Sequence, residues 1–126
     1  MENIEAKKII NKMQQEILKN GIVAANIAKS LKELRPYAIE ENKPTLTKVI
    51  RLTYEHLEQY NSFNIPIPAD EVIEGFEDEF EEQNSIEDDF EAKRESLLYL
   101  LSLMANDELK NNKEDLTLYR DALLNY

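Results

Sequence analysis

The stretch 96–105 reads SLLYLLSLMA and contains the longest uninterrupted apolar run of the chain, Leu97 to Leu101. It has neither glycine nor proline, and we predict one helix from about residue 86 to residue 106. A helix that is apolar around most of its circumference is typical of a buried position. We therefore expect this helix at the centre of the core or in a homodimer interface. The residues predicted on its main face are Ile86, Phe90, Leu97, Leu101 and Met104.

The first sixty residues carry three further helical patterns. Apolar residues recur every three or four positions, as in amphipathic helices, over about 2–19, 22–34 and 44–60. Gly21 suits a left-handed cap after the first helix. Pro36 is expected to end the second helix, or to begin one short turn over 37–41, whereas Pro44 suits a first helical turn. The short connections favour antiparallel packing.

Residues 61–69 have the pattern of an extended strap. Phe63, Ile65 and Ile67 alternate with polar residues or prolines. Two prolines in this stretch exclude a helix and a central strand. We expect the apolar side chains to lie across the helices as a lid.

Two more helices are predicted beyond the strap. The first covers about 70–83, with Phe76 and Phe80 more often facing a core than forming an exposed binding hot spot at this spacing. The second covers about 112–125, with Asn112 as its cap. Its apolar stripe is Leu116, Tyr119, Leu123 and Tyr126.

The predicted architecture is therefore all-α: a single domain, 1–126, built as an antiparallel bundle of five to six helices. It divides into a three-helix antiparallel unit (1–60), the extended connector (61–69), and an acidic helix with two further helices (70–126). Only two glycines and four prolines occur in 126 residues, which favours long helices over hairpins.

The charge is distributed unevenly. The window 70–91 holds twelve acidic residues and no lysine or arginine, so that the rest of the chain has 14 acids and 15 bases, and the net charge of −11 belongs to this window. Three interpretations are open: a solvated outer helix face, a docking surface for a basic partner, or imitation of nucleic acid. The candidate protein-binding residues are Glu74, Glu77, Asp78, Glu81, Glu82, Glu87, Asp88 and Asp89.

The sequence offers little for catalysis or metal binding. Cysteine is absent, which excludes disulfides and thiolate metal sites. The one histidine, His56, follows Glu55 on the side away from the apolar stripe, so we expect it at the surface or boundary. Thr53 stands where a di-metal bundle needs glutamate. Gly21 and Gly75 are isolated, which excludes a glycine-rich phosphate loop. We predict neither an enzyme, nor a cofactor, nor a specific metal site.

The preferred functional hypothesis is a non-enzymatic protein–protein interaction module that uses its acidic surface. The alternative is an inhibitor or immunity-type protein that blocks a basic, nucleic-acid-binding site by charge mimicry. A second alternative is a structural helical protein without a separate ligand. Direct nucleic-acid binding is disfavoured, because the lysines and arginines of 1–60 are interleaved with acids.

The expected location is the cytoplasm. The N-terminal residues are acidic and lack a secretory pattern, and the apolar runs fall far short of the roughly 20 residues that a membrane helix needs. The abundance of lysine and asparagine favours a bacterial source. The predicted partner is a protein with a basic surface, and a homodimer remains open. No motif is specific enough to name a family.

Overall fold

The computed structural model describes residues 1–68 and 89–126. Within these ranges the chain forms five helices and no strand, which confirms the all-α prediction. They are α1 (Ile4–Asn20), α2 (Ala24–Glu40), α3 (Pro44–Tyr60), α5 (Phe90–Ala105) and α6 (Lys110–Asn125). The helix predicted over 70–83, with Phe76 and Phe80, lies outside the described residues, and so does Ile86.

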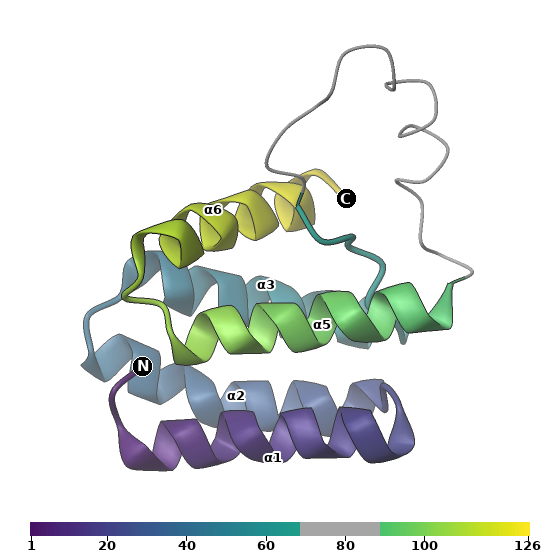
Figure 1. The fold of residues 1–126 in the computed structure, drawn as a ribbon, viewed down its shortest axis with the longest axis horizontal. Helices are drawn as coiled ribbons and strands as arrows, with labels where there is room; N and C mark the ends of the chain where they lie inside the picture. The colour runs from purple at the N-terminus through teal and green to yellow at the C-terminus, as the bar shows by residue number, and fades with distance from the viewer. Residues whose placement is uncertain (69–88) are drawn as a thin grey trace.

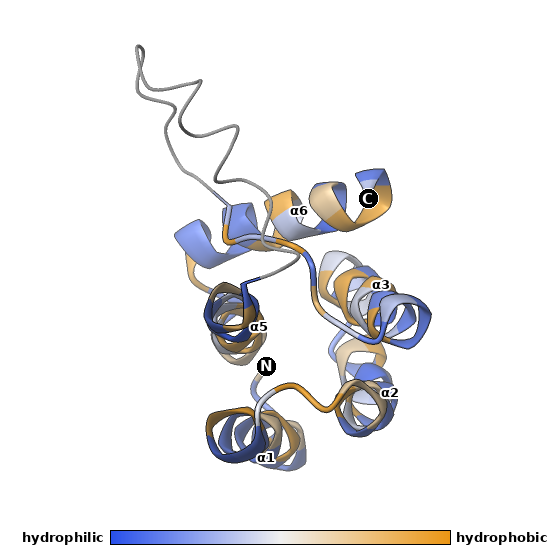
Figure 2. Ribbon diagram, turned by 90° about the vertical axis from the view of Figure 1, so that its right-hand side faces the viewer, coloured by the Kyte–Doolittle hydropathy of each residue, from blue (hydrophilic) through white to orange (hydrophobic). Residues whose placement is uncertain are grey.

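The five helices close a ring around one core. Helix α1 packs against α2 and α5, α2 packs against α3, and α6 packs against both α3 and α5. Figure 2 looks along the helices and shows this ring, with α1 and α2 on one side and α6 on the other. In Figure 1, α1, α2 and α3 run alternately back and forth, which confirms the antiparallel packing expected from their short connections.

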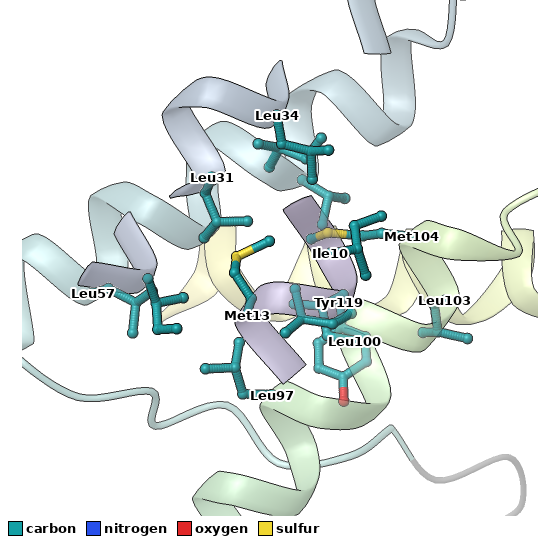
Figure 3. Close-up of a cluster of buried hydrophobic side chains, with 14 of the residues drawn as sticks. Ile10, Met13, Leu31, Leu34, Leu57, Leu97, Leu100, Leu103, Met104 and Tyr119 are labelled. Carbon is teal, nitrogen blue, oxygen red and sulfur yellow. The ribbon is translucent and has the colours of Figure 1, made fainter. Parts of the chain in front are cut away.

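The core draws side chains from every described helix. Figure 3 shows Ile10 and Met13 of α1 facing Leu31 of α2, Leu97 of α5 and Tyr119 of α6. The leucines that make α5 apolar around its circumference are buried within a single chain, and Leu98 and Tyr99 pack against them half-buried. The prediction that this helix contributes to the core is confirmed, but α5 occupies one place in the ring, between α1 and α6, and not a central one. The apolar excess of α5 is accounted for without a second copy, and the homodimer stays a prediction.

Helix α2 does not end before Pro36, as predicted, but continues to Glu40 with Pro36 inside it. Proline in a helix interior costs about 3 kcal/mol, because it removes one hydrogen bond and crowds the preceding turn. Burial on both sides of Pro36 offsets this cost: Leu34 and Ala38 are fully buried, and Tyr37 packs against the core. Glu41 caps the helix, and Asn42 then adopts a positive φ of 57°.

The strap behaves as predicted at two of its three apolar positions. Phe63 and Ile65 are buried in the core, whereas Ile67 is exposed. The Ser96 hydroxyl of α5 donates a hydrogen bond of 2.6 Å to the carbonyl of Ile65. Phe63 and Ile65 therefore belong to the core, although residues 61–68 lie outside any helix or strand.

Two predictions at the ends of α5 and α6 are wrong. Phe90 was expected on the buried face but is 82% exposed, because it occupies the first helical position, where its ring lies under the Lys93 ammonium instead of the core. Asn112 does not cap α6, which begins at Lys110. Its side chain donates instead to the carbonyl of Asn106, at 2.9 Å. Tyr126, the last residue of the predicted stripe, is 45% exposed.

Candidate functional site

Of the eight candidate residues in the acidic window, the structure places one. Asp89 caps α5, and its carboxylate accepts the Ala92 N–H at 3.0 Å. An acidic cap at this position satisfies a backbone donor that would otherwise lack a partner, and it interacts favourably with the helix dipole. Asp89 therefore has a structural role. The other seven, Glu74, Glu77, Asp78, Glu81, Glu82, Glu87 and Asp88, lie outside the described residues.

The described helices are close to neutral as a body. Residues 69–88 contain ten of the 26 acids and none of the 15 bases, so the described residues carry a net charge of −1 against −11 for the whole chain. The acidic segment, defined here as residues 70–91, begins two residues after Pro68 and ends in the first turn of α5, so that Asp89 and Glu91 belong to both the segment and the helical body. The asymmetry seen in the sequence is therefore an asymmetry between a nearly neutral helical body and one segment attached to it.

We call the end of the bundle where α3 and α6 finish and α5 begins after Asp89 the attachment end. The strap leads from this end back over the helices, and its Ile65 carbonyl lies at Ser96 of α5. The last residues of α3 and α6 meet there, with the Tyr60 and Tyr126 rings 4.9 Å apart. The start of α5 lies beside them: Phe90 lines a groove of about 240 Å³ together with Gly21 and Asn61. Figure 1 shows this end on the right.

Exposed apolar side chains gather at the attachment end. Phe90, at 82% exposed, is the most exposed large apolar side chain in the described part of the chain. Tyr60 and Tyr126 are each at least 40% exposed. Aromatic rings of this kind, next to charged residues, are the usual anchors of protein interfaces.

His56 is buried, with 5% of its surface exposed, so the prediction of a surface or boundary position is wrong. Its Nε2 accepts the Asn64 N–H at 3.1 Å, and its ring lies 5.7 Å from that of Phe63, because the strap folds back over the end of α3. The rings of Tyr60 and Tyr126 complete its surroundings, at 4.7 and 4.9 Å. Burial lowers the pKa of His56 to about 4 from its ordinary 6.5. The imidazole is thus a neutral acceptor that holds the strap.

The pH dependence of stability should report this role. The folded pKa of His56 lies below the unfolded one, so the unfolded chain binds the extra proton and stability falls as the pH drops from 6.5 towards 4. We expect the free energy of unfolding to decrease by about 2 kcal/mol between pH 7 and pH 5, measured by urea denaturation.

The matched variant is His56→Gln, which retains an acceptor for Asn64 but does not titrate. Its free energy of unfolding should stay nearly constant between pH 7 and pH 5. An equal decrease in both proteins would show that other groups cause the loss.

A second buried polar cluster joins α5, α6 and the strap. The hydroxyls of Ser96 and Tyr119 lie 2.9 Å apart, and the Tyr119 hydroxyl also donates to the Ser96 carbonyl at 3.1 Å. Burial raises the pKa of Tyr119 above its usual range. Beside it, the Tyr99 hydroxyl donates to the carboxylate of Asp115. The proton of Ser96 is directed at the Ile65 carbonyl, so this cluster fastens the strap and does not resemble an activated nucleophile.

An ionic cluster closes the opposite end of the bundle. The Met1 ammonium is buried and donates to the carbonyls of Met104 and Ala105, at 3.2 and 3.0 Å, and to the carboxylate of Asp107. Lys43 Nζ lies 2.8 Å from the same carboxylate. Burial opposes ionisation of Asp107, but the hydrogen bonds from Lys43 and the Met1 ammonium outweigh it and hold its pKa below the usual range. The cluster connects α1, the α2–α3 turn and the α5–α6 turn.

The sequence contained partial signals for these clusters. Tyr60 and Phe63 flank the strap near His56, but only the fold-back of the strap brings them together.

Among residues 1–68 and 89–126, no group of three or more histidine, aspartate or glutamate side chains could hold a metal ion. None of the described helices is long and apolar enough to cross a membrane. No protein-family model, curated protein or solved structure matches this chain.

Proposed function

We propose that this protein is a non-enzymatic binding module that presents its acidic segment, residues 70–91, to a partner protein with a basic surface. The main observation in support is that most of the net negative charge lies in one segment, whereas the described helices are nearly neutral. A nearly neutral ring of helices buries its own apolar residues, while twelve acids are concentrated in one segment joined to the attachment end. Charge on this scale accelerates association with a complementary surface.

The exposed aromatic residues at the attachment end support a protein as the partner. Charge alone gives fast but weak association, and most of the binding energy in protein interfaces comes from a few apolar or aromatic anchors. Phe90 directly follows the Asp89 cap, so an anchor of this kind stands at the point where the acidic segment joins α5. A partner that contacts the segment can bury Phe90 at the same time.

The described polar side chains support a non-enzymatic function. His56 accepts a backbone hydrogen bond and Ser96 donates one, so the imidazole and the buried hydroxyl serve the strap. A general base needs a free acceptor within reach of a substrate, and a nucleophilic serine needs such a base beside it. In the described part of the chain these groups are committed to structural bonds.

The binding test is a pull-down from nuclease-treated lysate of the source organism, eluted with a salt gradient. The chain should retain a basic protein that leaves at moderate salt. A variant with Glu77, Asp78, Glu81 and Glu82 changed to lysine should lose that protein. If the retained protein is a nucleic-acid-processing enzyme, an activity assay with added chain tests the narrower hypothesis of inhibition by charge mimicry.

A matched variant distinguishes the effect of where the acids lie from the effect of the total net charge. Changing Glu5, Glu33, Glu95 and Glu114 to lysine alters the net charge equally but affects exposed positions on the helices. This variant should retain the partner. Equal loss in both variants would show that only the overall charge matters, and retention by both would contradict the proposal.

The four lysine substitutions in the acidic segment should leave the fold intact. The proposal requires these four carboxylates to be accessible to a partner, and substitutions at accessible positions usually change stability by about 0.5 kcal/mol or less. We expect an unchanged helical circular-dichroism signal and a midpoint in urea close to that of the unmodified chain. Loss of the helical signal would show that these acids hold the structure together.

A further inference from the structure

A groove with an unusual charge lies between the last turns of α2 and the first turns of α3. Its volume is about 390 Å³. Among the described residues, its lining contains no carboxylate and four cationic residues: Arg35, Lys43, Lys48 and Arg51. Four cations in one groove are notable in a chain whose net charge is −11. We call this feature the basic groove.

Two of the four cations lack an ionic partner in the described part of the chain. Lys43 pairs with Asp107 at 2.8 Å, and Arg51 pairs with Glu55 at 3.5 Å. Within residues 1–68 and 89–126, Arg35 and Lys48 form no ion pair, and the Nε of Arg35 is buried without a hydrogen-bond acceptor. A buried hydrogen-bond donor without an acceptor costs free energy, and a ligand that supplies an acceptor would recover it. The groove is therefore suited to receive negatively charged oxygen atoms.

The groove also contains an apolar contact. Ile39 of α2 lines it and is 54% exposed. An inorganic anion makes no use of an exposed isoleucine, whereas an acidic peptide with apolar residues can contact both the cations and Ile39. The acidic segment has this composition, since Val72, Ile73 and Phe76 stand among its carboxylates.

The position of the groove relative to the acidic segment favours association between copies. The α2–α3 turn lies at the left of Figure 1, and the attachment end lies at the right. Helix α3, which joins the two ends, has 17 residues and is about 25 Å long at 1.5 Å per residue. Each chain thus has a cationic groove at one end and an anionic segment joined at the other, an arrangement suited to head-to-tail, heterologous contacts.

We propose that the basic groove binds the acidic segment of a second copy of this chain. The groove supplies guanidinium and ammonium donors and an apolar contact at Ile39, and the segment supplies carboxylates and apolar side chains. This inference rests on the proposed function only in that the acidic segment is the binding element. It adds the surface that receives the segment and identifies a partner.

The direct test is a titration of the full chain into a labelled synthetic peptide of residues 70–91 at low ionic strength, followed by fluorescence anisotropy. We expect saturable binding that weakens as salt is added. The double variant Arg35→Glu and Lys48→Glu should raise the dissociation constant at least tenfold. Because Arg35 is half-buried, the exposed single variant Lys48→Glu serves as a second test, and it should weaken binding by several-fold with an unchanged circular-dichroism signal.

The matched control changes Lys7 and Lys12 of α1 to glutamate, two exposed lysines far from the groove in the sequence, with the same change in net charge. This control should bind more tightly than the groove double variant by at least fivefold. Equal weakening in both would show that overall charge governs binding and would overturn the proposal. The absence of peptide binding to the unmodified chain, or full displacement by millimolar inorganic phosphate, would also overturn it.

Sedimentation velocity on the full chain tests the association itself. At low salt the average mass should increase with protein concentration, and the groove variant should remain monomeric. A mass independent of concentration would contradict the proposal. The two proposals can fail separately. The proposed function predicts that the groove variant still captures the basic protein from lysate, because that variant keeps the acidic segment. The contact between copies predicts that the groove variant loses binding of the peptide.

Discussion

Replacing Phe63 by alanine is expected to lower the free energy of unfolding by about 3–5 kcal/mol. Phe63 belongs to the strap, outside any helix, yet it is fully buried. Its ring contacts His56 of α3 and lies 6.3 Å from that of Tyr119 of α6. The substitution leaves a cavity where three elements meet, so the cost should resemble that of a helical core residue. Urea denaturation followed by circular dichroism measures it.

The chain provides a matched control in Phe90→Ala. The chemical change is the same, but Phe90 is 82% exposed, so its effect on stability should stay within about 0.5 kcal/mol. A small effect at Phe63 would show that the strap is not part of the core. A large effect at Phe90 would show that its ring is buried by something other than the described helices.

The second large effect is expected at Asp107. Changing it to asparagine keeps the shape but removes the charge that faces the Met1 ammonium and Lys43. Lys43 keeps Glu41 and Glu108 as carboxylate partners, at 3.2 and 3.6 Å, whereas the buried Met1 ammonium loses its one carboxylate partner among the described residues. A buried charge without its counter-ion is costly, and we expect a loss of about 3 kcal/mol. The midpoint of urea unfolding at pH 7 measures this loss.

The control for Asp107 is Asp121→Asn, which breaks the exposed pair with Arg120 at 3.1 Å. An exposed pair contributes about 0–1 kcal/mol, so this variant should be nearly as stable as the unmodified chain. Equal effects at both positions would contradict the view that burial makes the Asp107 cluster important.

Much of the fold could be predicted from periodicity. The stripes of α1 and α3 and the apolar circumference of α5 identified buried residues, because a helix that packs on one side must repeat its apolar positions every three or four residues. Helix α2 shows the limit of local rules. Pro36 resists a helix locally, but the burial of Ala38 beyond it depends on α3, which a reading of the local sequence does not include.

The errors at His56 and Phe90 have the same origin. A helical wheel assigns His56 to the outer side of α3, and only the return of the strap covers it. Phe90 fits the apolar stripe of α5, but it is the first residue of the helix, and its side chain is exposed there instead of packing in the core. Both depend on contacts between distant parts of the chain, which periodicity does not encode.

The candidate sites were predictable to different degrees. The acidic segment is visible in the sequence, because its acids are consecutive or nearly so. The basic groove is not, because Arg35 stands between Glu33 and Glu40 on α2, apart from the three bases of residues 42–54. The turn between α2 and α3 brings the four cations to one groove, whose described lining residues include no carboxylate. The basic groove is formed by residues of two helices, so it could be identified only from the folded structure.

The central claim is that the helical body supports a functional acidic segment. Its most direct test replaces residues 70–88 by a neutral glycine–serine linker of equal length and compares capture of the basic partner from lysate by the two chains. We expect the linker chain to retain the stability of the helical body and to lose the partner. Undiminished capture by a folded linker chain would contradict the claim, because binding would then reside in the described helices.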